Sequence, residues 1–164
     1  MLKYCRDKWY ENKDKLKEVI MNDKKINDCN YDYLVKLVVK YILNQPGDDD
    51  WDHFNEDKIT VIDNGDYQGT MLFMIPRKRY QPSEYDYLIT YAGYGSCSYC
   101  DTLLSIQSCG DELLPTEKQV NDYMILCKDL VCNIVKPYNS GWREDEDFDE
   151  VKELEMTTDR SNNG

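Results

Sequence analysis

The chain has 164 residues, 41% of them hydrophobic and 32% charged, which is the length and composition of one folded globular domain. Its 20 basic and 32 acidic side chains give a net charge of −12, which argues against direct nucleic-acid binding and favours a basic partner. No apolar run approaches the roughly 20 residues that cross a bilayer, and the start lacks the apolar core of a secretion signal. We therefore expect a cytoplasmic protein with no membrane contact.

Helical patterns occupy the first part of the chain. Between Tyr4 and Ile20, charges of both signs surround a thin apolar stripe, which predicts a surface helix. Asn30 is a suitable cap for a second helix over residues 30–44, in which apolar side chains recur every three or four positions until Pro46. This second helix is predicted to pack in the core.

The middle of the chain predicts a three-stranded antiparallel sheet. Strand-like runs rich in β-branched and aromatic residues cover 58–62, 69–75 and 85–91. The pair Asn64 and Gly65 is typical of the turn between the first two strands.

A second core helix is predicted over residues 116–136, because a capping-box signature opens an apolar stripe at helical spacing. These elements predict an α+β fold in which the sheet is flanked by the 30–44 and 116–136 helices. We expect one domain over residues 1–140, followed by an acidic tail or marginal helix over 141–164.

Acidic residues are concentrated in two segments that also contain tryptophan. Residues 45–76 carry a net charge of −7 and residues 137–164 carry −6. Such segments are either solvated loops or surfaces that steer a basic protein towards aromatic anchors. The predicted partner-binding residues are Asp48, Asp49, Asp50, Trp51, Asp52, Trp142, Glu144, Asp145, Glu146 and Asp147.

The strongest chemical motif is the Cys-x-x-Cys pair formed by Cys97 and Cys100, at the predicted end of the third strand. Such a turn serves either as a redox disulfide or as two corners of a zinc tetrahedron, and the motif alone leaves both uses open. For zinc, the predicted completing ligands are Asp129 and Cys132, which lie off the apolar stripe of the last helix. Cys127 lies on that stripe and is predicted to be a buried hydrophobe.

Signatures of catalysis are few. The chain has one histidine and contains no Gly-x-Ser-x-Gly, no phosphate-binding glycine-rich loop and no His-Glu-x-x-His. A zinc ion with four protein ligands has no open position for water, so the predicted Zn²⁺ is structural and the protein is predicted not to be an enzyme. The alternative is a small thiol-dependent or zinc-dependent enzyme centred on Cys97 and Cys100.

Three stretches of the sequence, at 66–70, 94–103 and 126–131, resemble a group of small bacteriophage proteins. The resemblance covers roughly residues 58–136 and depends mainly on the string Gly-Ser-Cys-x-x-Cys-Asp-Thr-Leu. In that group a histidine commonly stands at the place of Asp129, so this chain departs from the pattern there.

Some acidic phage proteins of this general appearance are anti-CRISPR inhibitors of type II effector nucleases. The resemblance implies a monomeric inhibitor in the cytoplasm of a bacterial host. Such a protein would bind the basic nucleic-acid-binding surface of a CRISPR effector nuclease and block access of DNA. A zinc-stabilised phage adaptor whose target is not a nuclease is a further alternative.

Overall fold

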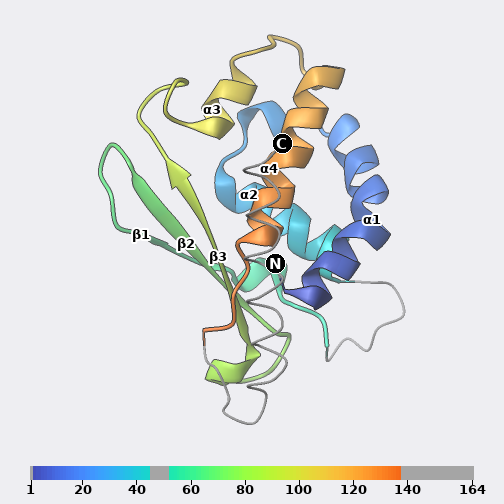
Figure 1. Cartoon of the computed structure of the whole chain (residues 1–164), viewed down its shortest axis with the longest axis vertical. Coiled ribbons are helices and arrows are strands. Elements are labelled where there is room, and N and C mark those ends of the chain that lie inside the picture. The colour runs from blue at the N-terminus through green and yellow to red at the C-terminus, as the bar shows by residue number, and fades with distance from the viewer. Residues whose placement is uncertain (1, 45–51, 138–164) are drawn as a thin grey trace, which may run out of the picture.

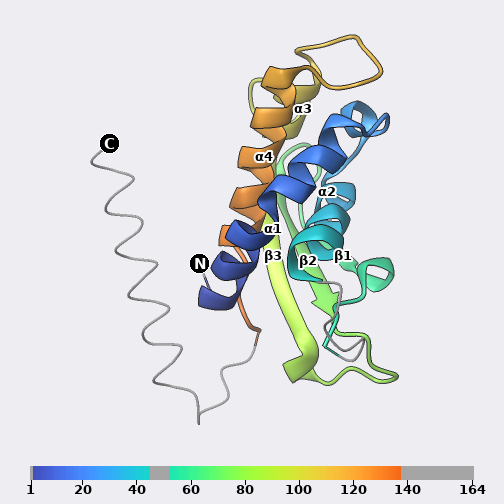
Figure 2. The ribbon, with the colours of Figure 1, turned by 90° about the vertical axis from the view of Figure 1, so that its right-hand side faces the viewer.

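The computed structural model describes residues 2–44 and 52–137, which form a layer of helices against a three-stranded antiparallel sheet (Figure 1). The strands are β1 (Thr60–Asp63), β2 (Gly69–Pro76) and β3 (Tyr87–Tyr94), in the order β1-β2-β3. The predicted α+β class and the predicted antiparallel sheet are confirmed. The long helices among the described residues lie together on one face of the sheet (Figure 2).

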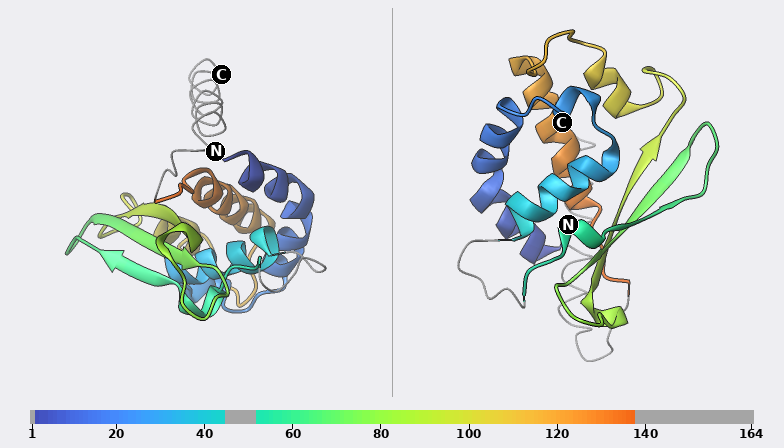
Figure 3. Two further views of the ribbon diagram at one scale, coloured as in Figure 1. Left: turned by 90° about the horizontal axis from the view of Figure 1, so that it is seen from below. Right: turned by 180° about the vertical axis from the view of Figure 1, so that it is seen from behind.

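The sheet divides its side chains between two faces, as the two-residue period of a strand requires. On the helix-covered face, Phe73 of β2 pairs with Thr90 of β3, and both side chains are buried. On the opposite face, Ile62 and Tyr91 lie on either side of β2 and are 45% and 42% exposed. The hydrophobic core therefore lies between the sheet and the helices. Figure 3 shows the arrangement of these elements from two further sides.

Three helices build most of this core. They are α1 (Lys3–Met21), α2 (Tyr31–Val38), which continues into the π-helical turn η2 (Val39–Leu43), and α4 (Glu117–Cys132). The apolar stripe of α1 is as narrow as predicted, and α4 and η2 lie beside it. The buried residues of α1 are Cys5, Trp9, Leu16 and Ile20. Burial of each such side chain contributes roughly 1.5–3 kcal/mol.

The start of α4 confirms the predicted capping box. The backbone N–H of Gln119 donates to the Thr116 hydroxyl at 3.2 Å, and the Thr116 N–H donates to the Gln119 side chain at 3.0 Å. Buried Gln119 also donates to the backbone oxygen of Ile106 at 3.0 Å. This bond ties α4 to the short helix α3 (Thr102–Gln107), which follows the cysteine motif.

Several predictions fall outside the described ranges. Residues 48–51 and 142–147, which hold nine of the ten predicted partner-binding residues, are not among those described, nor is the predicted tail over 141–164. Within residues 2–44 and 52–137, no helix is both long enough and apolar enough to cross a membrane.

Candidate functional site

The cysteine motif forms a tight turn between the end of β3 and the start of α3. The backbone N–H groups of Cys100 and Asp101 both donate to the carbonyl oxygen of Cys97, each at 3.0 Å. The turn also needs a glycine before it, because a Cβ at Gly95 would lie 2.5 Å from the carbonyl oxygen of Cys100. The local sequence therefore brings the side chains of Cys97 and Cys100 to the same side of a closed turn.

Asp101 anchors this turn to the rest of the fold. Its buried carboxylate accepts hydrogen bonds from the backbone N–H of Gly95 at 3.1 Å and from that of Leu104 at 3.1 Å, so it is the N-cap of α3. The hydroxyl of Tyr31, on α2, donates to the same carboxylate at 3.0 Å. One side chain thus connects the strand, the following helix and the core helix α2, and it holds the cysteine turn in place.

The two sulfur atoms of the turn are close together and open to solvent. Both cysteines are exposed and free, and their Sγ atoms are 2.7 Å apart. The pKa of the Cys100 thiol is lowered, chiefly by a hydrogen bond from the Cys97 thiol and further by backbone groups of Cys97 and Ser96 and by the Ser96 hydroxyl. Because the thiolate is the nucleophilic form of cysteine, this arrangement favours reaction at Cys100.

The sulfur spacing fits a disulfide better than a shared zinc ion. A disulfide bond is about 2.05 Å long. Two sulfurs on adjacent corners of a zinc tetrahedron lie about 3.8 Å apart when each is about 2.3 Å from the metal. The separation of 2.7 Å between Cys97 and Cys100 is nearer to the first value. In the described part of the chain, no three histidine, cysteine, aspartate or glutamate side chains are grouped so that they could hold a metal ion.

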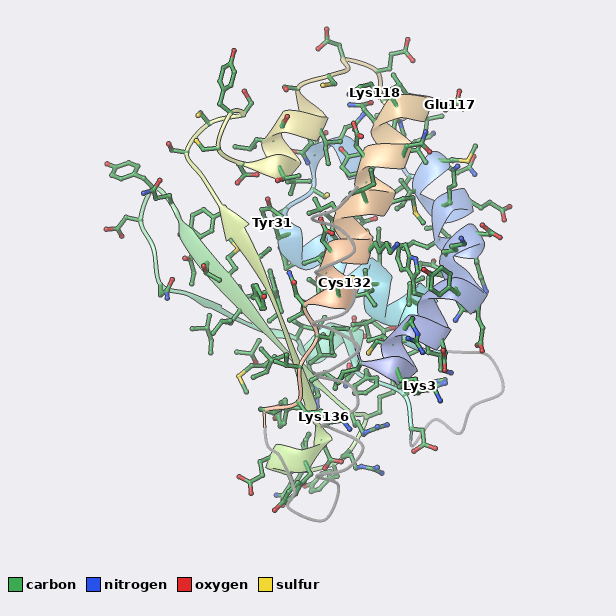
Figure 4. The ribbon with its side chains drawn as sticks, in the orientation of Figure 1. Lys3, Tyr31, Glu117, Lys118, Cys132 and Lys136 are labelled. Carbon is green, nitrogen blue, oxygen red and sulfur yellow. The ribbon has the colours of Figure 1, made fainter. Side chains whose placement is uncertain are left out.

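The predicted completing ligands lie beside the middle of β3, away from the motif. Asn133, just after α4, donates to the carbonyl oxygen of Tyr91 at 3.1 Å, and the backbones of Val135 and Ile89 are also hydrogen-bonded. The last turn of α4 therefore lies beside the middle of β3, whereas the motif follows the end of that strand. Figure 4 places Cys132 at the lower end of α4, far from the helix start marked by Lys118.

Helix direction explains this separation. A pocket beside Cys100 is lined by α4 residues only as far along the chain as Leu126. Cys132 lies six residues further, about 9 Å along the helix at about 1.5 Å per residue. Burial raises the pKa of both Asp129 and Cys132, and neighbouring Asp129 raises that of Cys132 further. These two side chains share a helix but are not brought to the pair of Cys97 and Cys100.

The other predicted residues have simpler environments. Cys127 is buried in the core, as predicted from the apolar stripe, and burial raises the pKa of its thiol. Asp52, the one predicted partner-binding residue that the structure describes, is exposed, and its carbonyl oxygen accepts a hydrogen bond from the Arg77 guanidinium at 2.8 Å. Its carboxylate lies 4.0 Å from the same guanidinium, so part of its charge is offset within the chain.

Sequence reasoning missed two residues that shape the site. The role of Asp101 as an N-cap has a signal in the sequence, because aspartate directly precedes the apolar run that begins α3. Asp122, on α4, lines the pocket beside Cys100 and has no comparable signal. Its place beside Cys100 depends on how α3 packs against α4, and the spacing of residues along the sequence does not specify that packing.

No protein family, curated protein or solved structure matches this chain.

Proposed function

We propose that Cys97 and Cys100 form a redox-active dithiol whose function is thiol–disulfide exchange. The observation that supports the proposal is the separation of 2.7 Å between two free, exposed sulfur atoms. The lowered pKa of Cys100 supports it further, because thiolate attack is the step that begins exchange. This choice favours the thiol-dependent alternative from the sequence over a saturated structural zinc site.

The reaction proceeds in two displacements. The Cys100 thiolate attacks one sulfur of a substrate disulfide, forms a mixed disulfide and releases the first substrate thiolate, which takes up a proton. Cys97 loses its proton to solvent and attacks the Cys100 sulfur, which forms the Cys97–Cys100 disulfide and releases the second substrate thiol. The substrate gains two electrons and the dithiol loses two. A dithiol reductant then restores the pair by the reverse exchange.

In the test, the reduced full-length protein is treated with hydroxyethyl disulfide. Both the thiols released from the disulfide and the mass of the cysteine-containing peptides of the protein are measured. We expect release of two thiols per chain and loss of two hydrogen atoms from a peptide that contains Cys97 and Cys100. The Cys97→Ser variant should instead stop at the mixed disulfide on Cys100, because the second displacement has no thiol. Cys109→Ser, which changes another exposed cysteine, is the matched control and should react like the unchanged protein.

Structural zinc is the competing use of the same thiols. If the purified protein holds one equivalent of zinc, and the metal protects Cys97 and Cys100 from hydroxyethyl disulfide, the redox proposal is wrong. If reaction occurs at other cysteines in preference to this pair, the proposal is also wrong. Retention of zinc by the Asp129→Ala and Cys132→Ser variants would then exclude the predicted completing ligands.

A second candidate function is the inhibitor implied by the resemblance to phage proteins. What supports it is the charge distribution, with −7 in residues 45–76 and −6 in residues 137–164. The predicted target is a basic nucleic-acid-binding surface, such as that of a CRISPR effector nuclease. Variants in which the acids of each segment are changed to amides should lose inhibition of DNA cleavage, and full inhibition by a variant neutralised in both segments would exclude this function.

A further inference from the structure

A pocket of about 340 Å³ opens beside the cysteine turn, between residues 98–102, α3 and α4. Cys100 lines this pocket and Cys97 does not. A ligand in the pocket therefore contacts Cys100, whose thiol pKa is lowered, and the Sγ atom of Cys97 lies 2.7 Å from that of Cys100. This arrangement matches the two roles of exchange, in which one thiol attacks the substrate and the other resolves the mixed disulfide.

The pocket walls combine hydroxyl groups, apolar side chains and carboxylates. Thr102 and Ser105 supply hydroxyls, and Ile125 and Leu126 supply an apolar surface. Its volume is at the small end of the roughly 300–1,000 Å³ typical of ligand pockets. The pocket therefore suits a short side chain or a small disulfide rather than a large cofactor.

The charged residues that line the pocket, Asp101 and Asp122, are both acidic. The chain segment that contains them, residues 95–126, has five acidic side chains and one basic side chain, which gives −4. The basic residue, Lys118, donates to the carboxylate of Asp122 at 3.1 Å. The Asp122 side chain is 33% exposed and that of Lys118 is 76% exposed, so the carboxylate is the inner partner and the ammonium the outer one. Exposed pairs of this kind are weak, so another cation can replace Lys118 at little cost.

We infer that this pocket selects disulfides that carry a positive charge close to the reacting sulfur atoms. The inference rests on the proposed exchange at Cys100. A cationic substrate is attracted by Asp122 and by the attacking thiolate, whereas an anionic substrate is repelled by both. On a protein substrate, the same chemistry corresponds to a disulfide with lysine or arginine beside one of its cysteines.

The test compares three small disulfides that differ in charge: cystamine, hydroxyethyl disulfide and dithiodiglycolate. Exchange rates with the reduced full-length protein are divided by those of a free small-molecule thiol, which removes the intrinsic reactivity of each disulfide. At low salt, we expect the corrected cystamine rate to exceed the corrected dithiodiglycolate rate on the order of tenfold or more. Raising the salt to about 0.15 M should reduce that ratio, because exposed charges are then screened over about 8 Å.

Two matched variants distinguish the effect of a carboxylate in the pocket from the effect of the net charge of the chain. Asp122→Asn removes a carboxylate from the pocket wall, and Asp57→Asn removes one from η3 (Glu56–Lys58), at the opposite end of the sheet. We expect Asp122→Asn to lose most of the preference for cystamine and Asp57→Asn to retain it. Equal losses in the two variants would show that only net charge matters and would overturn the inference.

Two further outcomes are distinguishable. If the unchanged protein reacts with all three disulfides at the same corrected rate, the pocket has no charge selectivity and the inference is wrong, while exchange at Cys100 stands. If the protein fails to react even with neutral hydroxyethyl disulfide, the proposed exchange itself is wrong.

Discussion

The cysteines of this chain occupy two contrasting environments. Cys97 and Cys100 lie on an exposed turn, where a hydrogen bond from Cys97 lowers the pKa of Cys100. Cys127 lies in the core, where burial raises the pKa of its thiol. Burial removes the water that stabilises a thiolate, whereas donors on an exposed turn stabilise it. Position in the fold, and not residue type, therefore decides whether a cysteine packs or reacts.

Different interactions also hold the buried cysteine and the cysteine turn in place. Cys127 is fully buried as part of the hydrophobic core. The turn depends on one buried carboxylate, Asp101, and its hydrogen bonds to Tyr31, Gly95 and Leu104.

The largest effect is expected from Asp101→Ala. The change removes the N-cap of α3 and leaves the buried Tyr31 hydroxyl and the Gly95 N–H without this acceptor. Loss of a cap costs about 1 kcal/mol and an unsatisfied buried group costs about 1–3 kcal/mol, so the free energy of unfolding should fall by about 2–4 kcal/mol. Urea denaturation measures this change.

Two control variants separate the contributions of Asp101. Tyr31→Phe removes the bond from α2 to Asp101 and also the bond that the Leu103 N–H donates to the Tyr31 hydroxyl at 3.3 Å, and it should cost about 1–2 kcal/mol. Asp101→Asn keeps an oxygen that can cap α3 and should cost less than Asp101→Ala. If Asp101→Ala lowered stability by under about 0.5 kcal/mol, as an ordinary surface change does, the turn would have another anchor.

A smaller loss in the free energy of unfolding is expected from the buried thiol of Cys127 as the pH rises. The folded state raises the pKa of Cys127, so above about pH 8.5 the unfolded chain loses a proton that the folded chain keeps. The stabilising effect of this shift is complete below that pH and is lost as the pH rises, by about 1.4 kcal/mol per pH unit. At pH 10 the loss from Cys127 should reach about 2 kcal/mol.

The Cys127→Ala variant tests this pH dependence. It should be about 1–2 kcal/mol less stable than the unchanged protein at pH 7, through lost packing, and its stability should fall less steeply above pH 8.5. Cys29, whose pKa burial raises to about 12, contributes to the same alkaline decline and should leave a residual slope. Parallel slopes in the unchanged protein and in Cys127→Ala would show that Cys127 ionises in the folded state as easily as in the unfolded one.

The smallest effect on stability is expected at the turn itself. Cys97→Ala changes an exposed side chain and should alter the free energy of unfolding by less than about 0.5 kcal/mol. Its effect should be chemical, because the Cys100 thiolate loses the hydrogen bond that chiefly lowers its pKa. Alkylation of Cys100 by iodoacetamide near pH 7 should therefore slow, and its pH midpoint should move upward.

Cys97→Ser refines this prediction, since a serine hydroxyl still donates a hydrogen bond and should preserve part of the reactivity of Cys100. Alkylation of Cys109 in the same samples provides the internal reference. Gross unfolding of Cys97→Ala would contradict the contrast drawn above and would favour a structural metal at the turn, because structural zinc contributes about 10 kcal/mol or more of apparent binding energy.

Much of the fold was predictable because its signals are local. The strands β2 and β3 and the helices α2 and α4 follow from apolar periodicity, and the capping box at Thr116 marks the start of α4 to the residue. The burial of Cys127 followed from the same stripe. The placement of the long helices on one face of the sheet was not predictable, because periodicity states which side of an element is apolar but not which element covers it.

Some features of the candidate site were likewise predictable from the sequence, and others were not. Local features predicted that a Cys-x-x-Cys turn lies between a strand and a helix, since Gly95 and the spacing of the two cysteines are read directly from the sequence. Tertiary structure alone decided which groups surround the turn. Because α4 runs antiparallel to β3, its first half, with Asp122, meets the turn, and its last turn, with Cys132, lies away from it. Spacing along a helix fixes which side chains share a face, but only packing fixes what that face meets.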